Sequence, residues 1–476
     1  MIFRDESAIV AEKEVARRLP RSLDIPVEDK ARGFFISHYV TGSSRAFDYI
    51  PPFLEPSKVD AHVYASISAV SLAHFSNKEH SPKVLHLARQ KYVSALNKTN
   101  TALASPESAA RDETLLSVLL LDLFEKITRT TPRYFPGWTS HVTGAIALAK
   151  LRGTKQFLTP IGIRMFVQLT STILISCVQQ DTSPPAELIS LRDQAAKYLN
   201  VQDPKWRYSA LVIQFIRLRR AMKDGALSST DLIYAAKKID EDFQSILDTM
   251  PPGWKFDRVH IPDHSDDVFD NYFDIYPDHR ITHIWNNIRL SRIQINENIR
   301  QQCVQGLESK VLDTFASDYA AEIDRCQQNM VALSHDIAAS IPQYTRVRYL
   351  SNVSNEFRLP SSEISQSVNE FPTFNDSASH SWASPRFYYY PTIPDRDQHY
   401  TPFEAARCYS LIFAIYIAAR CVFTTASLRT WLIGRLRFLS TMNIKEAKMA
   451  AEVLERNENV NPWTVYAMLG SYSFTA

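Results

Sequence analysis

The sequence predicts an all-α protein whose helices stack in antiparallel pairs, and three observations support this fold class. Glycine is scarce, with 11 residues in 476, whereas the 25 prolines fall mostly between apolar helical runs. Hydrophobic residues make up 45% and charged residues 22% of the chain, so a sizeable globular core can form. Strand signals are weak, because the aromatic run 386–390 is the best candidate and stands alone.

Two proline-marked starts define the central helices. Ser105–Pro106 reads as an N-cap followed by the first helical residue, and the chain then becomes apolar almost all round over 115–124. Thr159–Pro160 repeats the same start signal, and its helix should end before Pro184–Pro185. We therefore expect both helices in the core, the first of them at its centre.

The clearest amphipathic helix is expected to be capped by Thr230. Its apolar residues recur at three- and four-residue spacing: Leu232, Ala236, Ile239, Phe243, Ile246 and Met250. Pro251–Trp254 ends it. Further helices are predicted over Ile281–Cys303 and from about Val311 to Ile341, and a C-terminal set begins at Thr401–Pro402.

Composition divides the chain into two parts. Residues 1–32 form a charged N-terminal segment, and residues 33–476 form the helical domain. Within that domain, 351–398 is rich in Ser, Pro and Asn, which predicts a disordered insertion. The apolar run 409–423 is uninterrupted only over 411–419, too short for the ~20 residues of a membrane span, so we expect a core helix there.

Charge and cysteine content exclude several functional classes. The net charge of +2 gives no field of one sign for nucleic acid, and the basic residues within 1–32 are balanced by acidic ones. The basic cluster Arg217, Arg219 and Arg220 is predicted to form a solvent-exposed helix face. No pair of cysteines has CxxC spacing, so buried free thiols are expected at Cys177, Cys303, Cys326, Cys408 and Cys421.

One motif offers an enzymatic alternative. Asp266, Asp267 and Asp270 match the DDxxD pattern with which class I terpene cyclases hold magnesium against a diphosphate. The motif lies between Pro262 and Pro277, where a loop is expected instead of a helix. The second metal motif of such enzymes begins at Asn375, Asp376 and Ser379, but Ala383 stands where its Glu should be. We therefore predict no catalytic, cofactor-binding or metal site and no enzyme activity.

Several stretches carry a family resemblance that covers most of the chain outside 351–398. They include Phe3–Ser7, Thr114–Glu125, Trp138–Ala145, Met250–Trp254 and Asn461–Tyr472. In their order and spread they resemble the regulatory domain of fungal zinc-cluster transcription factors. The resemblance implies an all-α regulatory domain in the nucleus, whose partners are the transcription machinery or a DNA-bound protein. It also implies a small-molecule effector as a further ligand, and no membrane partner.

In this family a module of six cysteines holds two zinc ions just before a phrase like Phe3–Ser7. The sequence starts at Met1, so we expect this chain to lack that module and to bind DNA directly only if it is supplied elsewhere. Two versions stay open: an upstream exon encodes the cluster, with zinc as its cofactor, or the protein acts through a DNA-bound partner without one.

Overall fold

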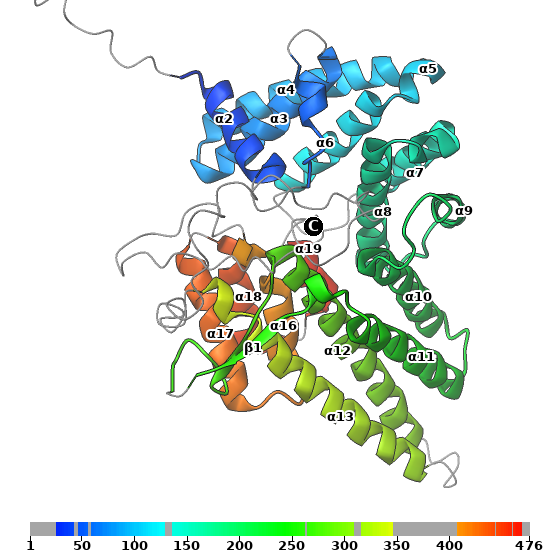
Figure 1. The fold of residues 1–476 in the computed structure, drawn as a ribbon, viewed down its shortest axis with the longest axis vertical. Helices are drawn as coiled ribbons and strands as arrows, with labels where there is room; N and C mark the ends of the chain where they lie inside the picture. The colour runs from blue at the N-terminus through cyan, green and yellow to red at the C-terminus, as the bar shows by residue number, and fades with distance from the viewer. Residues whose placement is uncertain are drawn as a thin grey trace, which may run out of the picture.

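The fold is almost entirely helical, with one two-stranded sheet in the part of the chain that the structure describes (Figure 1). The structure is a computed structural model that describes residues 25–41, 46–55, 59–128, 136–261, 264–308, 316–345, 407–442, 444–458 and 460–468. The all-α prediction is confirmed, and helices that are consecutive in the sequence pack against each other. The predicted insertion 351–398, the aromatic run 386–390, the second metal motif and the start at Thr401–Pro402 lie outside the described residues.

The N-terminal elements form a bundle at one end of the molecule, coloured blue to cyan in Figure 1. They are α2 (Val27–Phe35), a π-helical turn (Ile36–Val40), a 3₁₀ turn (Pro51–Leu54), α3 (Ala61–Lys78), α4 (Pro82–Leu103), α5 (Pro106–Ala109) and α6 (Asp112–Thr128). Helix α3 packs against α2, α4 and α6. Ala31 and Phe35 of α2 are buried in the core, so the domain boundary placed after residue 32 falls inside a helix that belongs to the bundle.

Helix α6 has the central place that its composition predicted. Leu115, Leu116, Leu119 and Leu120 are all buried. The start at Ser105–Pro106 is real, but it opens only the single turn α5, and α6 begins afresh at Asp112.

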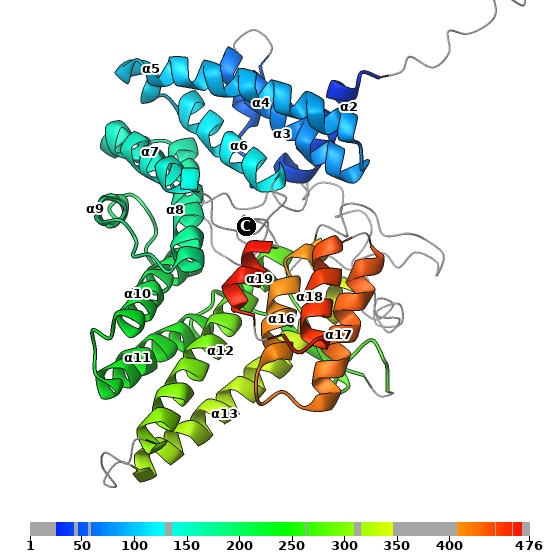
Figure 2. The ribbon, with the colours of Figure 1, turned by 180° about the vertical axis from the view of Figure 1, so that it is seen from behind.

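A series of helices along one side of the molecule joins this bundle to the rest of the chain (Figures 1 and 2). It contains α7 (Pro136–Arg152), a 3₁₀ turn (Gly153–Phe157), α8 (Pro160–Gln180), α9 (Ala186–Ala195), α10 (Pro204–Asp224) and α11 (Ser229–Asp248). The predicted start of α8 is confirmed, because the Thr159 hydroxyl accepts a hydrogen bond from the Gly162 amide at 3.1 Å. The helix ends before the two prolines, as expected.

The predicted cap of α11 was wrong by two residues. The Ser228 hydroxyl accepts a hydrogen bond from the Asp231 amide at 3.1 Å, so Thr230 lies inside the first turn. Serine and threonine are both good N-cap residues. The N-cap is the residue whose backbone is extended just before the helix begins, and here that residue is Ser228. All six apolar positions predicted for this helix are buried.

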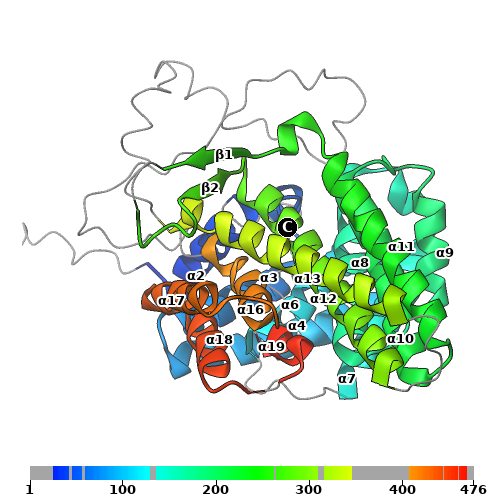
Figure 3. The ribbon, with the colours of Figure 1, turned by 90° about the horizontal axis from the view of Figure 1, so that it is seen from below.

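The C-terminal part contains the sheet and the remaining helices. Its elements are a 3₁₀ turn (Pro252–Trp254), β1 (Asp257–His260), β2 (Tyr272–Ile275), α12 (His279–Glu308), α13 (Ala316–Ala339), a 3₁₀ turn (Pro342–Tyr344), α16 (Ile412–Arg420), α17 (Ala426–Thr441), α18 (Lys445–Glu455) and α19 (Pro462–Met468). The strands are antiparallel, with Asp257 opposite Ile275 and His260 opposite Tyr272. The hairpin covers one face of the helices, as the view from below shows (Figure 3).

One hydrophobic cluster runs through the described part of the molecule, and two small satellite clusters accompany it. Residues 412–419 of α16 are all buried, which confirms the core helix expected in the run 409–423. Among the described residues, one helix is long and apolar enough to cross a membrane by length and composition alone. This is α8, and 67% of its apolar window is already buried inside the protein, as in a soluble core helix.

The cysteines follow the prediction except at Cys421, and one arginine of the basic cluster departs from it. All five cysteines are free thiols, four of them are buried, and Cys421 is half-buried. Arg219 does not lie on a solvent-exposed helix face. Its guanidinium donates a hydrogen bond to the Val178 carbonyl at 3.0 Å and pairs with Asp181 at 2.5 Å. The last turn of α8 and its C-cap residue Asp181 place these acceptors beside Arg219 of α10, which periodicity alone does not reveal.

Helix α19, the last described helix, packs between α8 and α16. Its Trp463 and Tyr466 rings lie 5.7 and 4.8 Å from the ring of Phe413, and both side chains are buried. The Arg219 guanidinium lies over Trp463 at 5.2 Å. Trp463 and Tyr466 therefore anchor α19 in the core.

Candidate functional site

The connection between β1 and β2 carries the acidic motif that the sequence singled out. Over its described residues 264–271 it forms turns and no helix, as expected from the flanking prolines. Asp270 and Asn271 both have a φ of 58°, in the left-handed region that Asn and Asp tolerate better than most residues. These two residues turn the chain back into β2.

The carboxylates of the motif point to different helices. Asp267 accepts a hydrogen bond from Nη1 of Arg435 on α17 at 3.0 Å. Oδ2 of Asp270 lies 2.5 Å from Nδ1 of His335 on α13. The carboxylates do not converge, and the described residues contain no group of three His, Cys, Asp or Glu side chains that could hold a metal ion.

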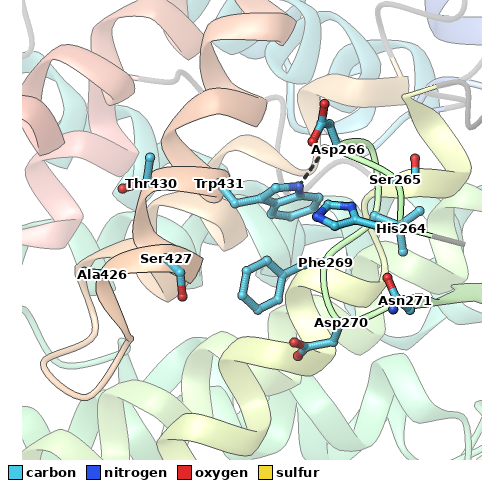
Figure 4. Close-up of a pocket in the computed structure, with 11 residues that line it drawn as sticks. His264, Ser265, Asp266, Phe269, Asp270, Asn271, Ala426, Ser427, Thr430 and Trp431 are labelled. Atoms are coloured by element: carbon cyan, nitrogen blue, oxygen red, sulfur yellow. Dashed lines mark hydrogen bonds between the residues drawn. The ribbon is translucent and has the colours of Figure 1, made fainter.

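The backbone of the motif is held as well. The indole Nε1 of Trp431 on α17 donates a hydrogen bond to the carbonyl oxygen of Asp266 at 2.9 Å (Figure 4). We call this set of contacts the hairpin clasp; it consists of Asp266, Asp267 and Asp270 with Trp431, Arg435 and His335. The clasp fastens the hairpin to α13 and α17, so the acidic motif has a structural use in this fold.

The opposite side of the hairpin is fixed by an ion-pair network that extends from the surface to a buried carboxylate. Arg258 of β1, which is exposed, donates two hydrogen bonds to the buried Asp274 of β2, at 2.8 and 3.1 Å, and a third to Asp336 of α13 at 2.9 Å. Arg289 of α12, which is buried, lies 3.9 Å from the same Asp274 carboxylate. Burial raises the pKa of Asp274, and the charges of the two arginines offset this only in part. An isolated two-stranded hairpin is marginal in water, so these contacts give it a fixed position.

A pocket of about 680 Å³ opens between the clasped hairpin connection and the first turns of α17 (Figure 4). Its lining is His264, Ser265, Asp266, Val268, Phe269, Asp270, Asn271, Ala426, Ser427, Thr430 and Trp431. The volume falls within the roughly 300–1,000 Å³ of small-molecule sites.

The pocket combines an aromatic wall with a polar rim. The ring centroids of Phe269 and Trp431 lie 5.8 Å apart at an interplanar angle of 53°, and Val268 beside them is buried. Around these side chains, Asp266 and Thr430 are exposed at the rim. The arrangement can bind a ligand that has an apolar body and polar substituents.

Sequence reasoning did not identify this pocket. Its two walls, 264–271 and 426–431, are far apart in the chain, and nothing in either segment indicates the other. The only signal was the acidic motif itself, and its partners on α13 and α17 appear only in the folded protein.

Comparison with known proteins identifies part of the chain. Residues 34–181 match the family described as the fungal specific transcription factor domain, which confirms the resemblance over the segment from the end of α2 through α8. An uncharacterized protein of Emericella nidulans is 30% identical over 102 residues, which is 21% of this chain and 21% of that protein. The chain therefore spans about a fifth of the length of that curated relative. No solved structure matches the chain. The pocket lies outside the matched segment.

Proposed function

We propose that this chain, which carries a fungal specific transcription factor domain over residues 34–181, is a transcription regulator that acts in the nucleus. The family match is the observation that supports the proposal. The fold agrees with it, because the matched helices share one hydrophobic core with the helices that follow them.

In this proposal, the helical domain couples an effector or a protein partner to promoter activity, and the pocket beside the hairpin clasp is the effector site. A ligand there would contact the hairpin connection and α17 together. It would shift the protein between conformations to the extent that it binds one arrangement of these elements more tightly than another.

Contact with DNA has two versions in this proposal. In the first, a zinc-cluster module is encoded upstream, and the genomic sequence should then contain six suitably spaced cysteines in a reading frame that joins near Ile2. A genomic sequence without them removes this version. In the second, a DNA-bound partner recruits the protein, and chromatin immunoprecipitation should lose its signal when that partner is deleted.

A tethering assay tests the regulatory function itself. The full chain is fused to a heterologous DNA-binding domain and expressed in a fungal host with a matching reporter gene. We expect reporter output to rise or fall relative to the DNA-binding domain alone at equal abundance, and a fluorescently tagged chain to collect in the nucleus. Unchanged reporter output together with exclusion of the tagged chain from the nucleus would contradict the proposal.

A further inference from the structure

We propose that the pocket between the hairpin connection and α17 binds a small organic cation with an apolar body, such as an arylalkylammonium compound. The identification of this ligand as the effector rests on the proposed function, but its binding to the pocket does not. Two features of the pocket support the inference: its charge and its aromatic wall.

The lining has an acidic character. It contains two carboxylates, those of Asp266 and Asp270, together with the imidazole of His264, and it contains no Lys or Arg. Asp270 is already engaged by His335, but the exposed Asp266 carboxylate has no ion pair or hydrogen bond within the described part of the chain. The guanidinium of Arg435 does not line the pocket; it is paired with Asp267 and lies 5.3 Å from the centre of the Trp431 ring. A ligand cation would therefore meet an uncommitted carboxylate at the rim.

The aromatic wall favours the same ligand. The faces of aromatic rings attract cations, and tryptophan does so most strongly. The orientation of Trp431 is fixed by its hydrogen bond to the Asp266 backbone, so this ring and the Asp266 carboxylate belong to one rigid unit. The ring of Phe269 completes an apolar surface for the body of the ligand.

Two hydroxyl groups at the start of α17 are already engaged. The Thr425 hydroxyl caps α17 by accepting a hydrogen bond from the Leu428 amide at 3.2 Å. The Ser427 hydroxyl lies within hydrogen-bonding distance of the same Thr425 side chain, at 3.1 Å. An anion would also be repelled by Asp266, whereas the oxygen of Thr430 can accept a hydrogen bond from an ammonium group.

A titration with three probes of similar shape tests the charge preference. Phenethylammonium, 2-phenylethanol and 3-phenylpropionate are titrated into the purified full chain and followed by ligand-observed nuclear magnetic resonance. We expect the cation to bind about threefold more tightly than the alcohol, since exposed ion pairs contribute modestly, and the acid to bind most weakly. Equal affinities, or tighter binding of the acid, would overturn the proposal.

Two substitutions test whether the probes bind in this pocket. Asp266→Asn should weaken phenethylammonium binding about threefold and leave 2-phenylethanol binding unchanged. Phe269→Leu should weaken the binding of both probes. The matched control is Glu241→Gln, which changes an exposed acid on α11 that has no ion pair in the described residues, and it should change neither affinity.

The thermal unfolding midpoint of each variant shows whether it is folded. Phenethylammonium affinity that is unchanged in folded Asp266→Asn refutes the assignment, and unchanged affinity in folded Phe269→Leu refutes it equally. The tethering assay separates the two proposals. If the chain binds the cation but never alters the reporter, the ligand proposal stands and the proposed regulatory function is wrong. If the chain alters the reporter but binds no cation, only the ligand proposal is wrong.

Discussion

Arg292 of α12 and Asp240 of α11 form a buried two-point ion pair. The Nε and Nη2 atoms of Arg292 lie 2.8 and 3.2 Å from the two carboxylate oxygens of Asp240. Asn296 donates a further hydrogen bond to this carboxylate at 3.0 Å, and Arg325 of α13 lies 3.5 Å from it. The side chain of one aspartate thereby connects three successive helices.

The first prediction concerns this pair. Asp240→Asn should lower the free energy of unfolding by about 3 kcal/mol, because it leaves a buried guanidinium without its counter-charge. Urea unfolding measures the change. Asp242→Asn, on the same helix, removes an exposed ion pair with Lys238 and should lower the free energy of unfolding much less. Equal losses of unfolding free energy in the two variants would show that the buried ion pair of Asp240 stabilises the fold no more than the exposed pair of Asp242.

A second prediction follows from close packing at the start of α8. A Cβ atom on Gly162 would lie 2.1 Å from the backbone oxygen of Gln156, whose side chain is itself held by hydrogen bonds to the Ala149 and Gly153 carbonyls. Gly162→Ala should therefore destabilise the fold by about 1–3 kcal/mol. Gly434→Ala is the matched control: that site in α17 has open space, and alanine there should stabilise by up to about 1 kcal/mol. Chemical denaturation of both variants should give shifts of opposite sign.

The third prediction is a loss of stability in mild acid. The rings of His38 and His74 lie 4.7 Å apart in the N-terminal bundle. Burial lowers the pKa of His38 to about 4, and burial together with the charges of His38 and Lys78 lowers the pKa of His74 well below 6.5. Both imidazoles therefore stay neutral in the folded state, whereas the unfolded chain takes up protons near pH 6.5. Stability should fall by about 1 kcal/mol or more as the pH decreases from 7 to 5.

The variant His38→Gln identifies the source of this pH dependence, because it removes one titrating group and should reduce the slope of unfolding free energy against pH. His80→Asn serves as the control, since His80 is exposed and its φ of 49° is one that asparagine tolerates. If both variants keep the slope of the parent protein, the buried histidines do not cause it.

The fourth prediction concerns the hairpin clasp. Arg435→Met keeps the aliphatic stem but removes the ion pair with Asp267, so backbone amides in 264–276 should exchange with solvent faster, and global stability should change by less than about 1 kcal/mol. Hydrogen exchange with mass spectrometry measures this effect. Arg437→Met, on the same helix, removes an exposed pair with Glu455 on α18 and should leave the hairpin unaffected. A hairpin that responds equally to both variants is not held by the clasp.

Local signals in the sequence predicted most of the helices. Thr159–Pro160 contains both the cap and the first helical residue, and the start of α8 could therefore be recognised without knowledge of the fold. The cap at Ser228 was missed because Thr230 offers the same chemistry two residues later. In both cases the decisive contacts lie within one turn, and the error was correspondingly small.

Longer-range features could not be predicted in this way. The strands β1 and β2 have four residues each, too few for a convincing alternation, and their position depends on Arg258 and Asp274. Arg219 was expected in solvent because its acceptors at the C-terminal end of α8 are distant in sequence. The pocket is the extreme case, since its two walls, 264–271 and 426–431, are more than a hundred residues apart in the chain.

The position of α19 has a consequence for the evolution of this chain. Because the last described helix packs against α8, the segment that carries the family signature is covered by residues 462–468, which lie far downstream of it in the chain. A recombination event that transferred only 34–181 to another protein would leave the apolar side of α8 without its cover. Selection should therefore keep the two regions together as one inherited unit.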